Sequence, residues 1–78
     1  MITCKITAFN NISAYSNLAS VTLPAFSGQM QIKQNHAESF ILLKKGNLIL
    51  KTLDNKITTI KIEEGECFVQ NNNIIILL

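Results

Sequence analysis

Apolar and polar side chains alternate with a period of two along much of the chain, which is the pattern of β-strands with one buried face. The first run, Ile2–Ala8, places Ile2, Cys4, Ile6 and Ala8 on one face and three polar residues on the other. Residues with branched β-carbons number 20 of 78, against five alanines, and β-branching favours a pleated strand over a helix. The pattern therefore predicts strands throughout and no long helix.

Turn-forming residues interrupt this pattern about every 8 to 12 residues, and most interruptions contain asparagine, which tolerates left-handed backbone angles. Pro24 is expected to end a strand, because proline has no N–H to donate to a ladder. Gly28, Gly46 and Gly65 are expected in turns with positive φ. After the first run, the expected extended segments are Ile12–Tyr15, Leu18–Leu23, Gln29–Lys33, Phe40–Leu43, Leu48–Leu53, Lys56–Glu63, Cys67–Gln70 and Ile74–Leu78.

These segments predict a single all-β domain over residues 1–78, an antiparallel β-sandwich or flattened β-barrel of short strands. Asp54-Asn55 lies between two alternating runs and predicts a two-residue hairpin turn of the primed type. Phe40–Leu43 is apolar on both faces, so this segment either crosses the core or meets a partner.

Charge and length narrow the classes of partner. Seven lysines and five carboxylates leave a net charge of +2, too weak to indicate nucleic acid or an anionic membrane. The longest apolar run, Ile74–Leu78, is far shorter than the roughly 20 residues of a spanning helix. The first residues lack the pattern of a secretory signal. A domain this short buries only about 60% of its unfolded surface, so we expect it to dock on a larger partner.

The reactive residue types do not form a catalytic or metal-binding pattern. Cys4 and Cys67 lack the neighbouring cysteines and histidines of a zinc site, and we expect two reduced, buried thiols. His36 is the single histidine and lies in a turn-like stretch, where we expect it to serve in a turn or an interface. A triad of Ser39, His36 and Asp54 can be written down, but no feature of the sequence places Asp54 near the other two. We expect no catalytic residues, no metal and no cofactor.

Five short motifs follow one another in an order that is more specific for a protein family than any single motif is. Together they closely resemble the N-terminal β-sandwich of the epsilon subunit of F-type rotary ATP synthases, which is called delta in mitochondria. The resemblance extends from about Ile2 to Leu78. The matching stretches are Ser20–Pro24, Ser27–Ile32, Asn35–Ala37, Leu43–Leu50 and Gly65–Leu77.

In that family the domain lies at the foot of the central stalk, turns with it, and couples rather than catalyses. The resemblance implies a non-catalytic rotor subunit that links the gamma subunit to the c-subunit ring and supports coupling of ion translocation to ATP synthesis. It also implies a peripheral location on the cytoplasmic face of a bacterial inner membrane, or the equivalent organellar face, with no small-molecule ligand. The c-ring contact would be Ser27, Gly28, Gln29, Met30 and Gln31, and the gamma contact would be Asn35, His36, Ala37, Glu38 and Ser39.

The chain departs from the family pattern at several positions. Gln29 stands where glutamate is common, so a charge pair with the ring becomes a neutral hydrogen bond of about 1 kcal/mol or less. Glu38 stands where proline usually follows His-Ala. The family usually continues into a C-terminal helical hairpin, whereas this chain ends at its last expected strand. We therefore expect neither ATP binding nor inhibition of ATP hydrolysis, which depend on those helices in the family.

The alternative interpretation is a stand-alone β-barrel module that binds a peptide or a small ligand. Such a module would share only short strands and turns with epsilon. Co-purification with a stalk and ring assembly would distinguish the two interpretations.

Overall fold

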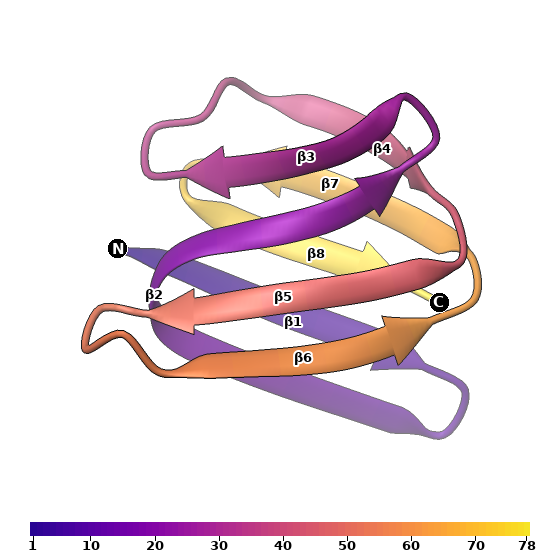
Figure 1. Cartoon of the computed structure of the whole chain (residues 1–78), viewed down its shortest axis with the longest axis horizontal. Helices are drawn as coiled ribbons and strands as arrows, with labels where there is room; N and C mark the ends of the chain where they lie inside the picture. Colours follow the sequence, from indigo (N-terminus) through magenta and orange to yellow (C-terminus); the bar gives the residue numbers. More distant parts are fainter.

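The computed structural model describes all residues from 1 to 78 and contains eight strands and no helix (Figure 1). The all-β prediction is therefore confirmed. The strands are β1 Ile2–Ala8, β2 Asn11–Ala25, β3 Gly28–Lys33, β4 Ser39–Leu43, β5 Gly46–Thr52, β6 Ile57–Ile62, β7 Gly65–Gln70 and β8 Asn73–Leu77.

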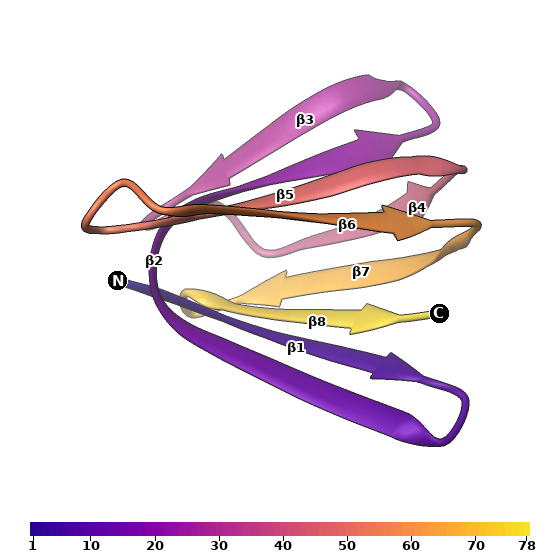
Figure 2. The same ribbon diagram turned by 60° about the horizontal axis from the view of Figure 1, so that its bottom comes forward.

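The strands form two layers that share β2. The front layer of Figure 1 consists of β3, the second half of β2, β5 and β6, and the back layer consists of β4, β7, β8, β1 and the first half of β2. Figure 2 shows β2 curving from one layer into the other. At this curve Asn17 has a φ of 56°, and Leu18 pairs with Ile2 of β1 and also with Thr52 of β5.

One pair of strands departs from the predicted antiparallel arrangement. β1 lies between β2 and β8 and runs parallel to β8, with Cys4 opposite Ile74 and Ile6 opposite Ile76. All other pairs are antiparallel. The parallel pair joins the first and last strands of the chain, so β1 and β8 are hydrogen-bonded to each other in the middle of the back layer.

The core lies between the layers and contains 17 buried apolar residues in one cluster. The predicted inward face of β1 is confirmed, since Ile2, Cys4 and Ile6 are buried. Cys4 and Cys67 are free, buried thiols, as predicted. In β4 the two faces separate, because Ile41 and Leu43 are buried whereas Phe40 and Leu42 are exposed.

Pro24 does not end a strand, and this prediction is wrong. The expected segments Ile12–Tyr15 and Leu18–Leu23 are parts of one 15-residue strand, which continues through Pro24 to Ala25. The pairing between β2 and β5 ends at Thr22, before Pro24 is reached. Pro24 is tolerated in the strand because β5 has no residue opposite it that would accept a hydrogen bond from a backbone N–H. The Pro24 carbonyl instead accepts a hydrogen bond from the N–H of Lys44 at 2.8 Å.

The predicted hairpin between β5 and β6 is confirmed, but its turn is not a two-residue primed turn. Four residues separate Thr52 from Ile57, and Asn55 has a φ of 67° whereas Asp54 is not in the left-handed region. A primed type I turn needs positive φ at both central residues. The longer loop is closed by the Thr52 N–H, which donates to the Lys56 carbonyl at 2.9 Å.

The three glycines have two different roles. Gly28 has a φ of 122°, as predicted, whereas Gly46 and Gly65 lie in strands and have no positive φ. At Gly46 and Gly65 glycine is needed because a side chain would not fit. A Cβ on Gly46 would lie 2.7 Å from the Cβ of Pro24, and a Cβ on Gly65 would lie 2.5 Å from the Leu77 carbonyl oxygen.

The fold contains no helix that is long and apolar enough to cross a membrane.

The close approach at Gly65 predicts a loss of stability in Gly65→Ala. The new Cβ would clash with backbone, which cannot turn aside as a flexible side chain can. We expect the free energy of unfolding to fall by about 1 to 3 kcal/mol in urea denaturation. The exposed control Ser16→Ala should change it by less than about 0.5 kcal/mol. An unchanged midpoint for Gly65→Ala would contradict the packing of β7 on the end of β8.

The buried thiols predict a dependence on pH. Burial raises the pKa of Cys4 and of Cys67 from 9.0 to about 12, and the neighbouring Cys67 adds to the shift at Cys4. Unfolded thiols ionise first, so the stability that the protonated thiols contribute is full below pH 9 and falls as pH rises toward 12. The variant with Cys4→Ala and Cys67→Ala should lose part of this alkaline decline in urea titrations.

Thiol alkylation gives an independent readout at pH 8. Iodoacetamide should modify the folded parent roughly a hundredfold more slowly than the unfolded chain, because the thiols react only after local opening. A Ser16→Cys variant, with its new thiol on an exposed position, should be modified in the folded state. Rapid alkylation of both native thiols would contradict their burial.

Candidate partner-binding surfaces

The two surfaces that the sequence predicts lie at opposite ends of β3 (Figure 1). The β2–β3 turn precedes Gly28, and the β3–β4 loop follows Lys33. The six residues of β3 span roughly 20 Å at about 3.3 Å each, so the turn residue Ser27 lies far from the loop residue Asn35, although Gly28–Gln31 of the ring-contact set continue along β3 toward that loop. The structure therefore does not bring them together into one site.

The predicted ring-contact residues are Ser27 in the turn of the β2–β3 hairpin and the first four residues of β3, Gly28 to Gln31. Phe26 and Ser27 make the turn, and Gly28 enters β3 at a positive φ that a side chain rarely adopts. Strand alternation then exposes Gln29 and directs the half-buried Met30 against the core. This hairpin can offer amide and hydroxyl hydrogen bonds on its outer side.

The predicted gamma-contact residues are Asn35 to Glu38 of the β3–β4 loop and Ser39, the first residue of β4. Asn35 opens it at a φ of 64°, and the N–H of His36 donates to the Lys33 carbonyl at 3.3 Å. The Nδ1 atom of His36 lies 2.9 Å from the Ala37 carbonyl oxygen, so the tautomer with a proton on Nδ1 donates to it. In that tautomer, Nε2 is free to accept a hydrogen bond from a partner.

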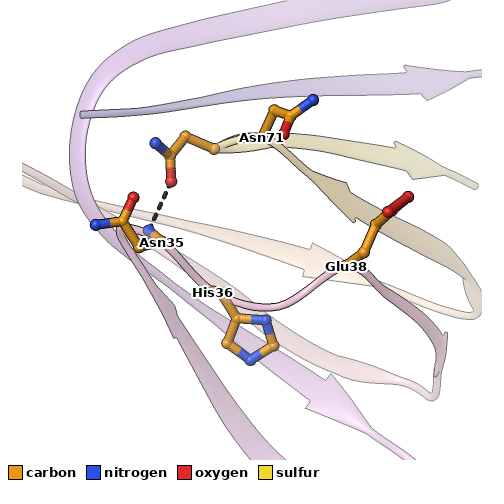
Figure 3. A pocket seen from close by; sticks show the side chains of 5 residues that line it. Asn35, His36, Glu38 and Asn71 are labelled. Atoms are coloured by element: carbon orange, nitrogen blue, oxygen red, sulfur yellow. Dashed lines mark hydrogen bonds between the residues drawn. The ribbon is translucent and has the colours of Figure 1, made fainter.

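A polar hollow of about 410 Å³ lies beside this loop and is lined by Asn35, His36, Glu38, Asn71 and Asn72. Figure 3 shows that the ring of His36 and the carboxylate of Glu38 lie on different sides of the loop. The lining offers amide, imidazole and carboxylate groups. Such groups can form hydrogen bonds with a partner surface.

The residues that support this loop could not be predicted from the sequence. Asn72, in the β7–β8 turn, accepts a hydrogen bond from the Asn35 N–H on its Oδ1 atom at 2.7 Å (Figure 3). The Asn72 carbonyl also accepts from the Thr3 N–H at 3.0 Å, and the amino group of Met1 donates to Gln34 Oε1 at 2.9 Å. These contacts join residues 30 or more positions apart in the sequence, so no local pattern could have revealed them.

The triad of Ser39, His36 and Asp54 is not formed. The Ser39 hydroxyl donates to the Ala37 carbonyl at 2.9 Å, and His36 contacts the same carbonyl. Asp54 lies in the β5–β6 loop, where Thr52 donates to it and Lys56 lies 3.8 Å away. No three metal-ligating side chains come together elsewhere.

Comparisons with known proteins identify the fold. The chain superposes on a chain of the Euglena gracilis mitochondrial ATP synthase, in a structure of its OSCP, F1 and c-ring parts, with a TM-score of 0.91 at 19% identity. It superposes on a chain from the central stalk and c-ring of the Tetrahymena thermophila mitochondrial ATP synthase with a TM-score of 0.80 at 13% identity. Each match covers 97% of this chain, but 49% and 61% of the matched chains respectively. This chain therefore spans about half of one relative and three fifths of the other.

No curated protein sequence matches the chain. The sequence model of one family does, and its description is "ATP synthase, Delta/Epsilon chain, beta-sandwich domain". The matched region is residues 1–78, the whole of the chain shown here. The chain therefore belongs to the ATP synthase delta/epsilon family, as the order of its motifs predicted, and its eight strands form the β-sandwich domain of that family.

Proposed function

We propose that this domain is a non-catalytic part of the rotor in a rotary ATP synthase, where it links the gamma subunit to the c-subunit ring. The observation that carries the proposal is the family match over residues 1–78. The two similar structures support it, because one comprises the OSCP, F1 and c-ring parts of an ATP synthase and the other the central stalk and c-ring of an ATP synthase. In this role the domain supports coupling of ion translocation to ATP synthesis. It is held at the membrane through the complex, on the cytoplasmic face in a bacterium or the equivalent face in an organelle.

The loop Asn35–Ser39 serves as the gamma contact in this proposal. The hydrogen bond from Asn35 to Asn72 fixes the loop before a partner arrives, so less conformational entropy is lost on binding. His36 is half-buried, and its ring is held by the Ala37 carbonyl. A preformed turn of this kind is suited to a clamp that stays bound while the rotor turns.

The segment Ser27–Gln31 serves as the ring contact. Its exposed polar residues, Ser27, Gln29 and Gln31, carry no charge. The contact with the polar loops of the ring is therefore made by neutral hydrogen bonds, each with a net contribution of about 1 kcal/mol. A substitution that adds charge here tests the surface directly.

The proposed gamma contact predicts weaker binding for His36→Ala. The parent chain should bind isolated gamma subunit in calorimetric titration, and the variant should bind about five- to tenfold more weakly, which corresponds to one lost hydrogen bond. Its free energy of unfolding should change by less than about 0.5 kcal/mol. Absence of any binding by the parent would contradict the proposed function. Unfolding of the variant would make His36 a structural residue and contradict its role as a contact.

The proposed ring contact predicts a loss of coupling for Gln29→Lys. A fixed positive charge at the hairpin repels a basic ring loop, which is common in the family, so proton-coupled ATP synthesis in reconstituted membranes should fall. Affinity for isolated gamma should stay within about twofold, because the two surfaces are distant and independent. Thr59→Lys, an exposed position on the edge strand β6, is the matched control and should leave both measurements unchanged. Normal coupling in Gln29→Lys would show that this hairpin does not face the ring.

A further inference from the structure

Strand β6 lies at one edge of the front layer and pairs with β5 alone. Figure 1 shows β6 at the opposite edge of that layer from β3. The pairing of β6 with β5 is regular along the whole strand and contains no bulge. The side of β6 that faces away from β5 is therefore a straight, open strand edge.

The ladder with β5 identifies the backbone groups on this open edge. The Thr52 N–H donates to the Lys56 carbonyl at 2.9 Å, so these two residues form a hydrogen-bonded pair. Such pairs alternate along an antiparallel ladder, so the even-numbered residues of β6 direct their N–H and carbonyl groups toward β5. The backbone groups of Ile57, Thr59 and Lys61 point the other way, where no strand pairs with them.

The sequence of β6 does not protect this edge. Natural sheets usually guard an edge with a proline, a bulge, an inward-pointing charge or a very short strand. β6 has none of these, and its one charged residue, Lys61, is exposed on the outer face. The other residues of the strand are all isoleucine or threonine, which favour pairing with a further strand. β6 is therefore suited to accept an added strand.

The packing around β6 is also incomplete. On the inward face Ile62 is buried, but Ile60 is only half-buried and Thr58 is exposed. On the outer face Ile57 exposes 63% of its surface. A strand added beside β6 would cover apolar surface on both faces, which is favourable.

We propose that β6 is a strand-addition site and that its occupant is β6 of a second copy of this chain. The two strands run antiparallel and are related by a twofold axis at Ile60. The two front layers then form one continuous sheet in the order β3-β2-β5-β6-β6-β5-β2-β3. This inference does not rest on the proposed function, because the β2–β3 turn and the loop Asn35–Ser39 lie at the ends of β3, at the far edge of the layer.

Charge selects this register. A twofold axis at a residue position keeps inward side chains opposite inward side chains. With the axis at Ile60, Lys56 of each copy lies opposite Glu64 of the other, and both residues are exposed. Opposite charges directly across two strands stabilise the pairing. Axes one or two residues earlier leave Lys56 opposite an isoleucine, and an axis at Lys61 places that lysine opposite its own copy.

The same register satisfies the open edge. Thr59 of each copy lies opposite Lys61 of the other, so these two pairs form about four hydrogen bonds between the copies. On the inward face, Ile60 lies beside its own copy, and Thr58 lies opposite Ile62. Any extended peptide can form the backbone bonds, whereas the matched charges at both ends of the junction favour a second copy.

The first test removes a backbone donor from the open edge. Sedimentation equilibrium should show a reversible dimer of the parent chain, with a dissociation constant in the micromolar range. Thr59→Pro removes an N–H that β5 does not use, so the monomer should keep its circular dichroism spectrum while the dimer weakens at least tenfold. The matched control Thr59→Val keeps the N–H and the branched shape, and it should dimerise within about twofold of the parent.

A charge exchange keeps the inference testable if Thr59→Pro does not fold. Glu64→Lys places a lysine opposite Lys56 and should weaken the dimer about three- to tenfold, more at low than at high salt. The double variant Lys56→Glu and Glu64→Lys exchanges the two charges and should restore the affinity of the parent to within about twofold. Glu38→Lys, with the same charge change at an exposed position in the β3–β4 loop, should dimerise like the parent.

A disulfide tests the register. Ile60 directs its backbone groups toward β5, so Ile60 and its copy form a non-hydrogen-bonded pair with Cα atoms about 4.5 Å apart, which is within disulfide range. Ile60→Cys should therefore cross-link the dimer under mild oxidation. Thr58→Cys, on the same face but opposite Ile62, should not cross-link.

The outcomes are distinct from those that test the proposed function. A parent chain that remains monomeric at millimolar concentration would overturn the inference, whether or not it binds gamma. A dimer that is unchanged in both Thr59→Pro and Glu64→Lys forms through another surface, which also overturns it. Cross-linking through Thr58→Cys in place of Ile60→Cys would show a different register and would overturn the proposed pairing.

Discussion

Strand β2 is shared by the two layers, and every other element is placed by its pairing with β2 or with a strand next to it. The first half pairs with β1, and the second half pairs with β3 and β5. The bend at Asn17 makes this possible, because asparagine adopts a positive φ at modest cost, and it is followed by the fully buried Leu18. One continuous strand therefore closes the sandwich around its core without a helix or a disulfide.

This arrangement keeps the proposed ring contact and the proposed gamma contact apart from each other. β3 leaves the tip of β2 at Gly28 and returns along the front layer, so the hairpin and the β3–β4 loop lie at its two ends. The core between the layers makes a rigid spacer of close-packed side chains. In the proposed role, a rigid core keeps the gamma contact and the ring contact at a constant distance from each other.

Partner binding and stability are related in a domain this small. Five large apolar side chains of β4, β7 and β8 are exposed to water, namely Phe40, Leu42, Phe68, Ile75 and Leu77. The β3–β4 loop also depends on long-range hydrogen bonds, one donated by Asn35 to Asn72 and one donated by Met1 to Gln34. A partner that covers these side chains would bury apolar surface, and such a partner binds the folded form in preference to the unfolded chain. The chain is thereby stabilised by the assembly in which we propose it works.

The sequence by itself determined the faces of most strands and the positions of most turns, but the turn expected at Ser16-Asn17 is wrong, because both residues lie inside β2. Alternation identified Ile2, Cys4 and Ile6 as core, and Asn10, Asn17, Asn35, Asn55, Asn71 and Asn72 all adopt positive φ. These are local properties, set by side-chain periodicity and by the backbone preference of single residues. The order of motifs also predicted the family and the residues of both proposed contacts.

Only the tertiary structure decided which strands are neighbours. The sequence could not show that β2 runs through Pro24, that β1 is parallel to β8, or that Gly65 is glycine because Leu77 passes beside it. Nor could it show that Phe40 meets Phe68 and that Asn72 holds Asn35. The physical reason is the same in each case: these contacts join residues far apart in the chain, and their energies depend on packing, which no local pattern of residues encodes.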